Sequence, residues 1–269
     1  MTLVAAAINA ASAKSGRKTG EGAQPLRAPP LALTLIEGRG LAEFAATYAF
    51  KGVLKNAPKG DGHPVIVLPG FLASDRSTQP LRKFLTGLGY DAHGWGQGQN
   101  LGRFNKMRTL LEAYVDHIYT QTGQKVSLIG WSLGGVFARH LALVMPDKIR
   151  SVITLGSPFA ADVDATSAKK LYETLSKEGP AKRADLIRLA GDLPVPNTSL
   201  YSKLDGVVNW RASLSKPAAN SENIEIRLAS HVGIGVNPAS FWAIADRLAQ
   251  ADGVFTPFAK TGPFSLAYG

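Results

Sequence analysis

The sequence predicts an α/β fold with an open, mostly parallel sheet that is covered by helices on both faces. Between residues 64 and 250, short apolar runs alternate with segments in which apolar residues recur at helical spacing. This alternation is typical of parallel strands joined by crossover helices. The apolar runs are also continuous, as expected for strands that are buried on both faces. In such a sheet, ligands bind beyond the carboxyl ends of the strands.

Each element is assigned in chain order from its apolar pattern and from the residues that end it. Strands are expected at residues 64–70, 90–95, 125–130, 151–159, 197–203 and 223–230. Helices are expected at residues 41–54, 78–89, 105–123, 133–145 and 238–250. Gly123 is expected to cap the end of one helix, and Pro146 stops the next.

The chain is expected to divide at about residue 60. Residues 1–60 are rich in Ala, Gly and Pro and are interpreted as an amino-terminal arm with one helix, while residues 61–269 form the α/β domain. Residues 160–197 are helical in pattern and carry mixed charges. We expect this segment to be a helical cap inserted into the domain, and a plain pair of surface helices is the alternative.

The composition excludes several classes of site. There are no cysteines, which rules out disulfides, thiolate metal sites and a cysteine nucleophile. The formal charge is +10, but the Lys and Arg residues are scattered, so we expect no nucleic-acid partner and leave open a weak association with anionic surfaces. No apolar run reaches the ~18 residues of a transmembrane segment. The first residues match a secretory signal poorly, and we expect a cytoplasmic protein without excluding secretion.

A serine stands between glycines where an expected strand turns into an expected helix. The stretch reads Gly-Trp-Ser-Leu-Gly-Gly, with Ser132 at its centre. A Gly-x-Ser-x-Gly match alone is weak evidence, but a strand before it and a helix after it are typical of a nucleophile elbow. A serine hydroxyl is a poor nucleophile unless a base removes its proton. The elbow therefore predicts a histidine and an acid further along the chain.

The base is expected to be His231. His63 and His93 precede the serine, which is the wrong order for this arrangement. His117 and His140 lie inside expected helices, where a histidine is more often solvated or structural. His231 follows the last expected strand in a glycine-containing loop, at the edge of the sheet where the serine is expected.

The acid is expected to be Asp205, which stands with Gly206 in a turn after the strand at 197–203. An Asp-Gly pair alone is usually just a turn. The competing residue is Asp192, but it precedes that strand and so belongs at the other end of it. The order of serine, aspartate and histidine along the chain is the one this arrangement requires.

Two backbone N–H groups are expected to bind the oxyanion that forms when an ester carbonyl is attacked. One belongs to Leu133, directly after the serine, and the other to Phe71 in the loop after the first strand. Gly70 lets the chain turn closely, and Pro69 has no N–H to donate. Leu72 is an alternative donor to Phe71.

Four blocks of this sequence, VIVLPGF, GWSLGG, YSKLDGVVNW and SHVGIG, resemble those of α/β-hydrolase-fold serine esterases and lipases in their order and spacing. The resemblance covers roughly residues 63 to 250. It implies hydrolysis of a small-molecule ester with an apolar acyl or alcohol group through an acyl-enzyme, with neither a metal nor an organic cofactor. The chain lacks the His-Gly-Gly-Gly loop and the cysteines that parts of this family carry.

Two other functions use the same residues or the same scaffold. An acyltransferase would pass the acyl group from Ser132 to an acceptor other than water. A non-catalytic binding protein would keep only the scaffold, but it would have no need of all three of Ser132, Asp205 and His231. A nucleotide-binding interpretation of GWSLGG fails because the Lys-Ser/Thr pair of a phosphate-binding loop is absent.

Overall fold

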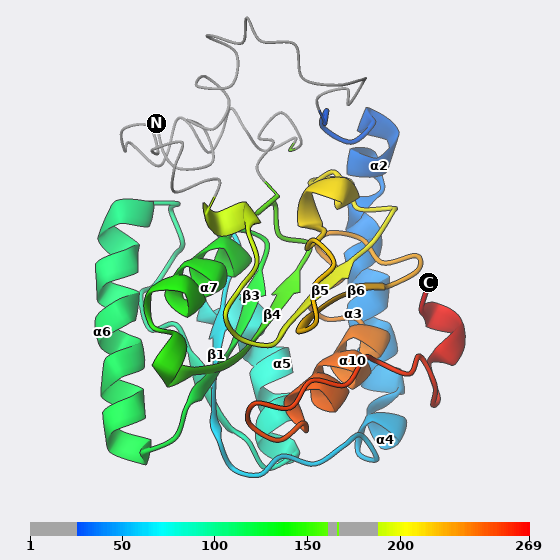
Figure 1. Ribbon diagram of the computed structural model, residues 1–269. Coiled ribbons are helices and arrows are strands. Elements are labelled where there is room, and N and C mark those ends of the chain that lie inside the picture. Colours follow the sequence, from blue (N-terminus) through cyan, green and yellow to red (C-terminus); the bar gives the residue numbers. More distant parts are fainter. Residues whose placement is uncertain (1–25, 161–165, 167–187) are drawn as a thin grey trace, which may run out of the picture.

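The computed structural model describes residues 26–160, 166 and 188–269 (Figure 1). Its centre is a six-stranded sheet in the order β2-β1-β3-β4-β5-β6. The strands are β1 (Pro64–Leu68), β2 (Asp91–Gly94), β3 (Val126–Trp131), β4 (Ile149–Leu155), β5 (Asn197–Tyr201) and β6 (Ser221–Glu225). All five neighbouring pairs are parallel, so every carboxyl end lies at the same edge of the sheet. The predicted α/β class is confirmed.

Helices cover both faces of this sheet. The long ones are α5 (Asp75–Gly87), α6 (Phe104–Thr122), α7 (Leu133–Val144) and α10 (Pro238–Leu248). Ahead of β1 the chain forms α2 (Leu31–Leu35), the 3-10 turn η1 (Glu37–Arg39), α3 (Gly40–Ala49) and α4 (Lys51–Leu54). Shorter 3-10 turns are η2 (Pro146–Lys148), η4 (Trp210–Ser213) and η5 (Ser265–Ala267). Figure 1 shows α3 running beside α10.

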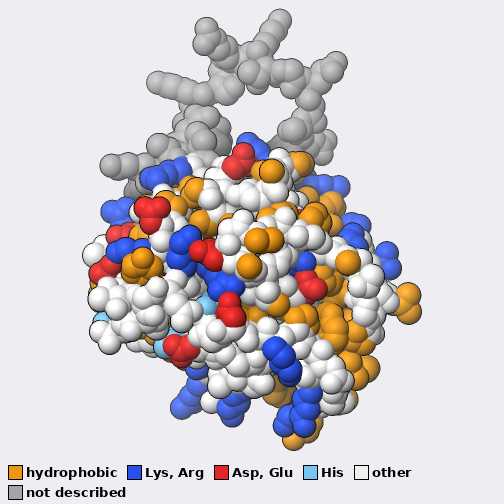
Figure 2. Space-filling model, turned by 60° about the horizontal axis from the view of Figure 1, so that its bottom comes forward, with side chains coloured by type: hydrophobic (Ala, Val, Ile, Leu, Met, Phe, Trp, Pro, Cys, Tyr) orange, Lys and Arg blue, Asp and Glu red, His pale blue; other side chains and the backbone are white. Residues whose placement is uncertain are grey.

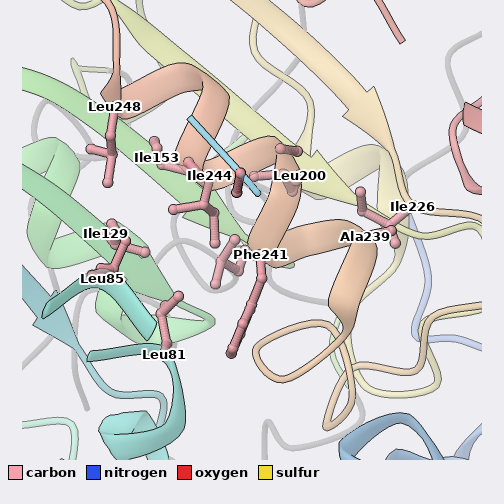
Figure 3. Close-up of a cluster of buried hydrophobic side chains, with 14 of the residues drawn as sticks. Leu81, Leu85, Ile129, Ile153, Leu200, Ile226, Ala239, Phe241, Ile244 and Leu248 are labelled. Carbon is pink, nitrogen blue, oxygen red and sulfur yellow. The ribbon is translucent and has the colours of Figure 1, made fainter. Parts of the chain in front are cut away.

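Successive residues of the central strands β1, β3 and β4 pack into two separate cores because side chains alternate between the faces of a sheet. In β1, Ile66 and Leu68 join the core under α6 and α7. Val65 and Val67 join the core under α5 and α10. Figure 3 shows this second core, where Phe241 of α10 lies among side chains from α5 and the strands. Burial on both faces explains why the strands read as continuous apolar runs.

The structure places some element ends differently from the sequence pattern. The strand expected at 151–159 ends at Leu155, because Gly156 turns the chain with a φ of 54°. The strand expected at 223–230 runs from Ser221 to Glu225, and Leu228 takes a φ of 61° in the bend that follows. Gly123 has the expected role, since it ends α6 in the left-handed conformation with a φ of 65°.

Parts of the predicted arm (1–60) and most of the predicted cap (160–197) lie outside the described residues. These parts are residues 1–25 of the arm and residues 161–165 and 167–187 of the cap, so the division at residue 60 and the cap stay predictions. Within the cap, Thr166 is described, and its backbone forms an antiparallel bridge with Val208. None of the helices among the described residues is both long and apolar enough to span a membrane. Figure 2 shows Lys and Arg side chains interspersed with other types on the face that it presents.

A buried histidine ties the amino ends of the central strands together. His63 is fully buried just before β1, its Nδ1 lies 2.5 Å from Asp61 and its Nε2 lies 2.9 Å from the Ser127 hydroxyl. Ser127 in turn lies 3.0 Å from the hydroxyl of Ser151 on β4. Burial lowers the pKa of His63 more than its hydrogen bond to Asp61 raises it. The folded protein therefore takes up a proton at this histidine less readily than the unfolded chain.

We expect His63 to lower the free energy of unfolding as the pH drops below about 6.5, the ordinary pKa of histidine. Above that value both states hold neutral imidazole, whereas below it the unfolded chain gains a proton that folded His63 resists. Urea unfolding of the wild type and of His63→Gln at pH 8 and pH 5.5 measures this contribution. The variant should lose less stability on acidification, and an equal loss in both proteins would show that His63 does not carry the effect. The pKa of buried His140 is lowered too, but His140 is present in both proteins.

Candidate active site

Ser132 occupies a sharp corner at the carboxyl edge of the sheet. β3 ends at Trp131 and α7 begins at Leu133, so one residue makes the whole turn from strand to helix. Ser132 takes φ 52° and ψ −121°, which is unusual and costly for a residue other than glycine. Its N–H donates to the carbonyl of Leu155 on β4 at 2.8 Å, which anchors the corner to the neighbouring strand. This conformation lifts the side chain off the strand.

The corner is possible because the strand and the helix meet without side chains between them. A Cβ placed on Gly130 would lie 2.3 Å from the Cα of Gly135, a distance that real Cβ atoms do not show. Glycine at both positions therefore lets α7 return directly over the end of β3. The glycines that surround Ser132 in the sequence are explained by this close approach.

The loop after β6 brings His231 to Ser132. The imidazole Nε2 lies 3.0 Å from the Ser132 hydroxyl, and the residue is 7% exposed. The indole of Trp131 donates to the backbone carbonyl of His231 at 3.0 Å. The residue just before the serine thus holds the loop that carries the histidine.

The loop after β5 brings Asp205 to the far side of the same imidazole. Its Oδ2 lies 2.7 Å from Nδ1 of His231, and the residue is 4% exposed. Its Oδ1 accepts the N–H groups of Val207 and Val208 at 2.9 and 2.7 Å, which fixes the carboxylate in its turn. The competing Asp192 is exposed and lies before β5. Ser132, His231 and Asp205 therefore form one hydrogen-bonded row, and Asp192 does not belong to it.

Two carboxylates change the protonation behaviour of His231. Burial by itself lowers the pKa of the imidazole, but the charges of Asp205 and Glu37 and the hydrogen bond to Asp205 raise it above its ordinary value. An imidazole in this position can accept a proton from the Ser132 hydroxyl and hold it as a stabilised cation. The arrangement can therefore activate a serine for attack on a carbonyl.

The loop after β1 passes beside the serine. A Cβ built on Gly70 would lie 3.2 Å from the Cβ of Ser132. The N–H of Leu72, the alternative oxyanion donor, donates to the carbonyl of Asn100 at 2.7 Å. Leu133 is the first residue of α7, where an N–H has no partner within the helix. The oxyanion roles of Phe71 and Leu133 stay predictions.

Residues that the sequence pattern did not reveal hold the loops of Asp205 and His231. Glu37 is 9% exposed, and its carboxylate accepts N–H groups from Gly206, His231 and Val232 at 2.7, 3.0 and 2.9 Å. Glu43 accepts from the N–H and the hydroxyl of Ser230 at 2.8 and 2.6 Å. Both acids stand in the predicted arm, far from these loops in sequence, and no local pattern marks them as partners of these loops.

The apolar residues near the predicted catalytic loops have different surroundings. Val208 is 1% exposed and packs with Ala212, so it serves the core. Trp210 stacks on Tyr201 with ring centres 5.6 Å apart. Val232, next to the histidine, is 49% exposed and can contact a ligand.

Within the described part of the chain, no three His, Asp or Glu side chains are placed to bind one metal ion.

A family model described as the alpha/beta hydrolase fold matches residues 45–182 of this chain. A pimeloyl-[acyl-carrier protein] methyl ester esterase of Aliivibrio salmonicida is 28% identical over 174 residues, which are 60% of this chain and 62% of that protein. A triacylglycerol lipase of Burkholderia plantarii is 30% identical over 158 residues, 55% of this chain and 44% of that protein. The matches thus span less than two thirds of either relative.

Among solved structures, lipase B of Aspergillus fumigatus has a similar fold. The TM-score is 0.55 at 18% sequence identity, over 71% of this chain and 53% of that one. At this identity the likeness concerns the fold alone.

Proposed function

Because the chain belongs to the alpha/beta hydrolase fold family, we propose that it is a serine hydrolase that cleaves carboxylic esters with apolar acyl or alcohol groups. The observation that carries the proposal is the continuous row from the Ser132 hydroxyl through His231 to Asp205, with distances of 3.0 and 2.7 Å. A nucleophile, a base and a group that orients the base are the parts that covalent catalysis by serine needs. The esterase and lipase names of two relatives support the same chemistry.

In the first half of the reaction, the Ser132 oxygen attacks the ester carbonyl while its proton moves to Nε2 of His231. Asp205 accepts the Nδ1–H of the ring and so keeps Nε2 free to take that proton. The carbonyl oxygen becomes an oxyanion, which the N–H groups of Leu133 and Phe71 stabilise. The bond to the leaving alcohol then breaks, His231 returns its proton to the alkoxide, and an acyl-enzyme remains.

In the second half, water takes the place of the alcohol. His231 removes a proton from the water as its oxygen attacks the acyl carbonyl, and a second oxyanion forms at the same two N–H groups. When the bond to Ser132 breaks, His231 returns the proton to the serine oxygen, and the carboxylic acid leaves. An acceptor other than water at this step would make the protein an acyltransferase.

The experiment that tests this function measures the hydrolysis of p-nitrophenyl esters with acyl chains of increasing length. Each buried methylene contributes about 0.8 kcal/mol, so kcat/KM should rise by up to several-fold per added carbon until the pocket is full. An acyl group with a terminal carboxylate should be a poor substrate, because its charge would be buried without a partner.

A flat or falling series from acetate onward would contradict an extended apolar acyl site. It would indicate a small or polar one instead. No hydrolysis of any ester by folded protein would contradict the proposed function as a whole. Release of p-nitrophenol only when a second alcohol is added, with the new ester as product, would favour the acyltransferase.

A further inference from the structure

One carboxylate joins the two loops that carry Asp205 and His231. Glu37, in the turn η1, accepts the N–H of Gly206 at 2.7 Å and that of His231 at 3.0 Å on the same oxygen. Its other oxygen accepts the N–H of Val232 at 2.9 Å. Gly206 directly follows Asp205, so the Glu37 side chain binds the backbone next to Asp205 and at His231.

Neighbouring residues of the same segment strengthen this connection. The Thr34 hydroxyl donates to the carbonyl of Gly206 at 2.6 Å. The Arg39 guanidinium donates to the carbonyls of Leu204 at 2.5 Å and Ala229 at 3.2 Å, again one from each loop. The packing is close, since a Cβ on Gly206 would lie 2.3 Å from the carbonyl oxygen of Leu33. Residues 33–39 therefore pack against the Asp205 loop and the His231 loop at the same time.

The carboxylate of Glu37 is buried, and burial of a charge is unfavourable unless hydrogen bonds compensate for the lost water. Here three backbone N–H groups donate to its two oxygens, which an amide with a single acceptor oxygen could not fully replace. The charge of Glu37 has a second consequence, because it raises the pKa of His231 together with that of Asp205. The cation on His231 would exist while Ser132 attacks, so a fixed negative charge near the ring would favour that state.

We propose that Glu37 is a positioning residue of the active site, which sets the Asp205 and His231 loops against each other and stabilises the imidazolium formed during catalysis. The proposal rests on the proposed function, since it needs the hydrogen-bonded row of Ser132, His231 and Asp205 to be catalytic. Glu37 lies before residue 45, where the match to the family model begins.

The charged groups around His231 come from three elements. Asp205 lies on the loop after β5, and its Oδ2 is 2.7 Å from the ring. Glu37 and Arg39 belong to η1, where Arg39 is bound to loop carbonyls. Glu43 belongs to α3, and its carboxylate is occupied by Ser230 and by the Asn237 amide, which donates at 2.8 Å. Among these, Asp205 and Glu37 act on the pKa of His231.

The test replaces Glu37 by glutamine, which keeps the shape of the side chain but removes its charge and one of its two acceptor oxygens. We expect kcat to fall by about 10- to 100-fold, by analogy with the loss when a group that orients a metal ligand is removed. KM should stay nearly unchanged, because Glu37 is not part of the proposed substrate pocket. The reaction needs neutral His231, so its rate falls as the pH drops through the pKa of that ring. In Glu37→Gln this acid limb should move to lower pH, because one of the charges that raise the pKa is gone.

The matched control is Glu43→Gln on the next helix. It changes a half-buried acid that binds the same histidine loop but whose charge is not among the causes of the pKa shift of His231. It should lower the melting temperature and leave the acid limb in place. An equal shift of the acid limb in Glu43→Gln would overturn the proposal, because general loosening of the loop would then explain the effect.

Two further readouts separate this proposal from the proposed function. NMR titration of the His231 ring follows the electrostatic effect without any reaction, and a fluorophosphonate reports whether Ser132 is a nucleophile in the wild type. Labelled Ser132 with unchanged kcat, acid limb and ring titration in Glu37→Gln would overturn the role of Glu37 alone. No labelling of the wild type would overturn the proposed function and, with it, the catalytic part of this role.

If Glu37→Gln does not fold, the test is instead the hydrogen-exchange rate of backbone amides in the wild type. The amides of His231 and Val232 are expected to be protected, because Glu37 accepts both. Exchange of both at the rate of an open loop would overturn the proposal.

Discussion

Replacing Ser132 by alanine is expected to lower kcat for ester hydrolysis by on the order of 10⁶-fold, the loss known for the nucleophile of a Ser-His-Asp triad. The variant should remain folded, because alanine adopts the same corner conformation and only the hydroxyl is lost. Steady-state kinetics with a p-nitrophenyl ester measures the loss. Mass spectrometry after fluorophosphonate treatment should find the label on Ser132 alone in the wild type and on no residue in Ser132→Ala.

The chain offers a matched control on the same strand. Ser127 also lies within hydrogen-bond distance of a histidine, and His63 in turn meets Asp61, so this row imitates the one at Ser132. Ser127 is fully buried near the amino end of β3, however, where no ester can reach it. Ser127→Ala should therefore leave kcat and labelling unchanged. A label on Ser127, or full activity of Ser132→Ala, would refute the assignment of the nucleophile.

These two rows show how much of the position of the candidate site can be inferred from the sequence. Ser132, Asp205 and His231 each follow a different parallel strand, and the carboxyl ends of parallel strands share one edge of the sheet. Three short local patterns therefore suffice to bring distant residues together. His63 and Ser127 precede or begin their strands, which puts their row at the opposite edge. The two rows contain similar residue types, and they differ in whether these residues follow their strands or precede and begin them.

The parts that sequence reasoning missed depend on long-range packing. Glu37 and Glu43 look like surface residues of an arm, and their partners lie between 169 and 195 positions away. No local pattern encodes such a contact. Residues with positive φ follow the early ends of β4 and β6, and one of these, Leu228, is of a type that rarely adopts it. The cap at 160–197 still stands as an expectation, because its central part is outside the described residues.

Asp205→Asn tests the proposed role of Asp205 in orienting His231 and should lower kcat by on the order of 10⁴-fold. The oxygen of the asparagine side chain can still accept the N–H groups of Val207 and Val208, so the turn should survive. Its NH₂ would then face Nδ1 of His231 as a donor, which forces the ring proton onto Nε2. A protonated Nε2 cannot take the proton of Ser132, so attack would be slow in a site of nearly native geometry.

The control for this change is Asp192→Asn, which alters an exposed carboxylate ahead of β5. Both variants should unfold in urea close to the wild type, and only Asp205→Asn should lose activity. Greater damage from Asp192→Asn would mean that the acid has been assigned to the wrong loop. Loss of stability in Asp205→Asn together with loss of activity would mean that the carboxylate mainly holds the turn. Unchanged stability with a 10⁴-fold lower kcat is the result that a role in orienting His231 requires, because that role acts on the imidazole proton and not on the fold.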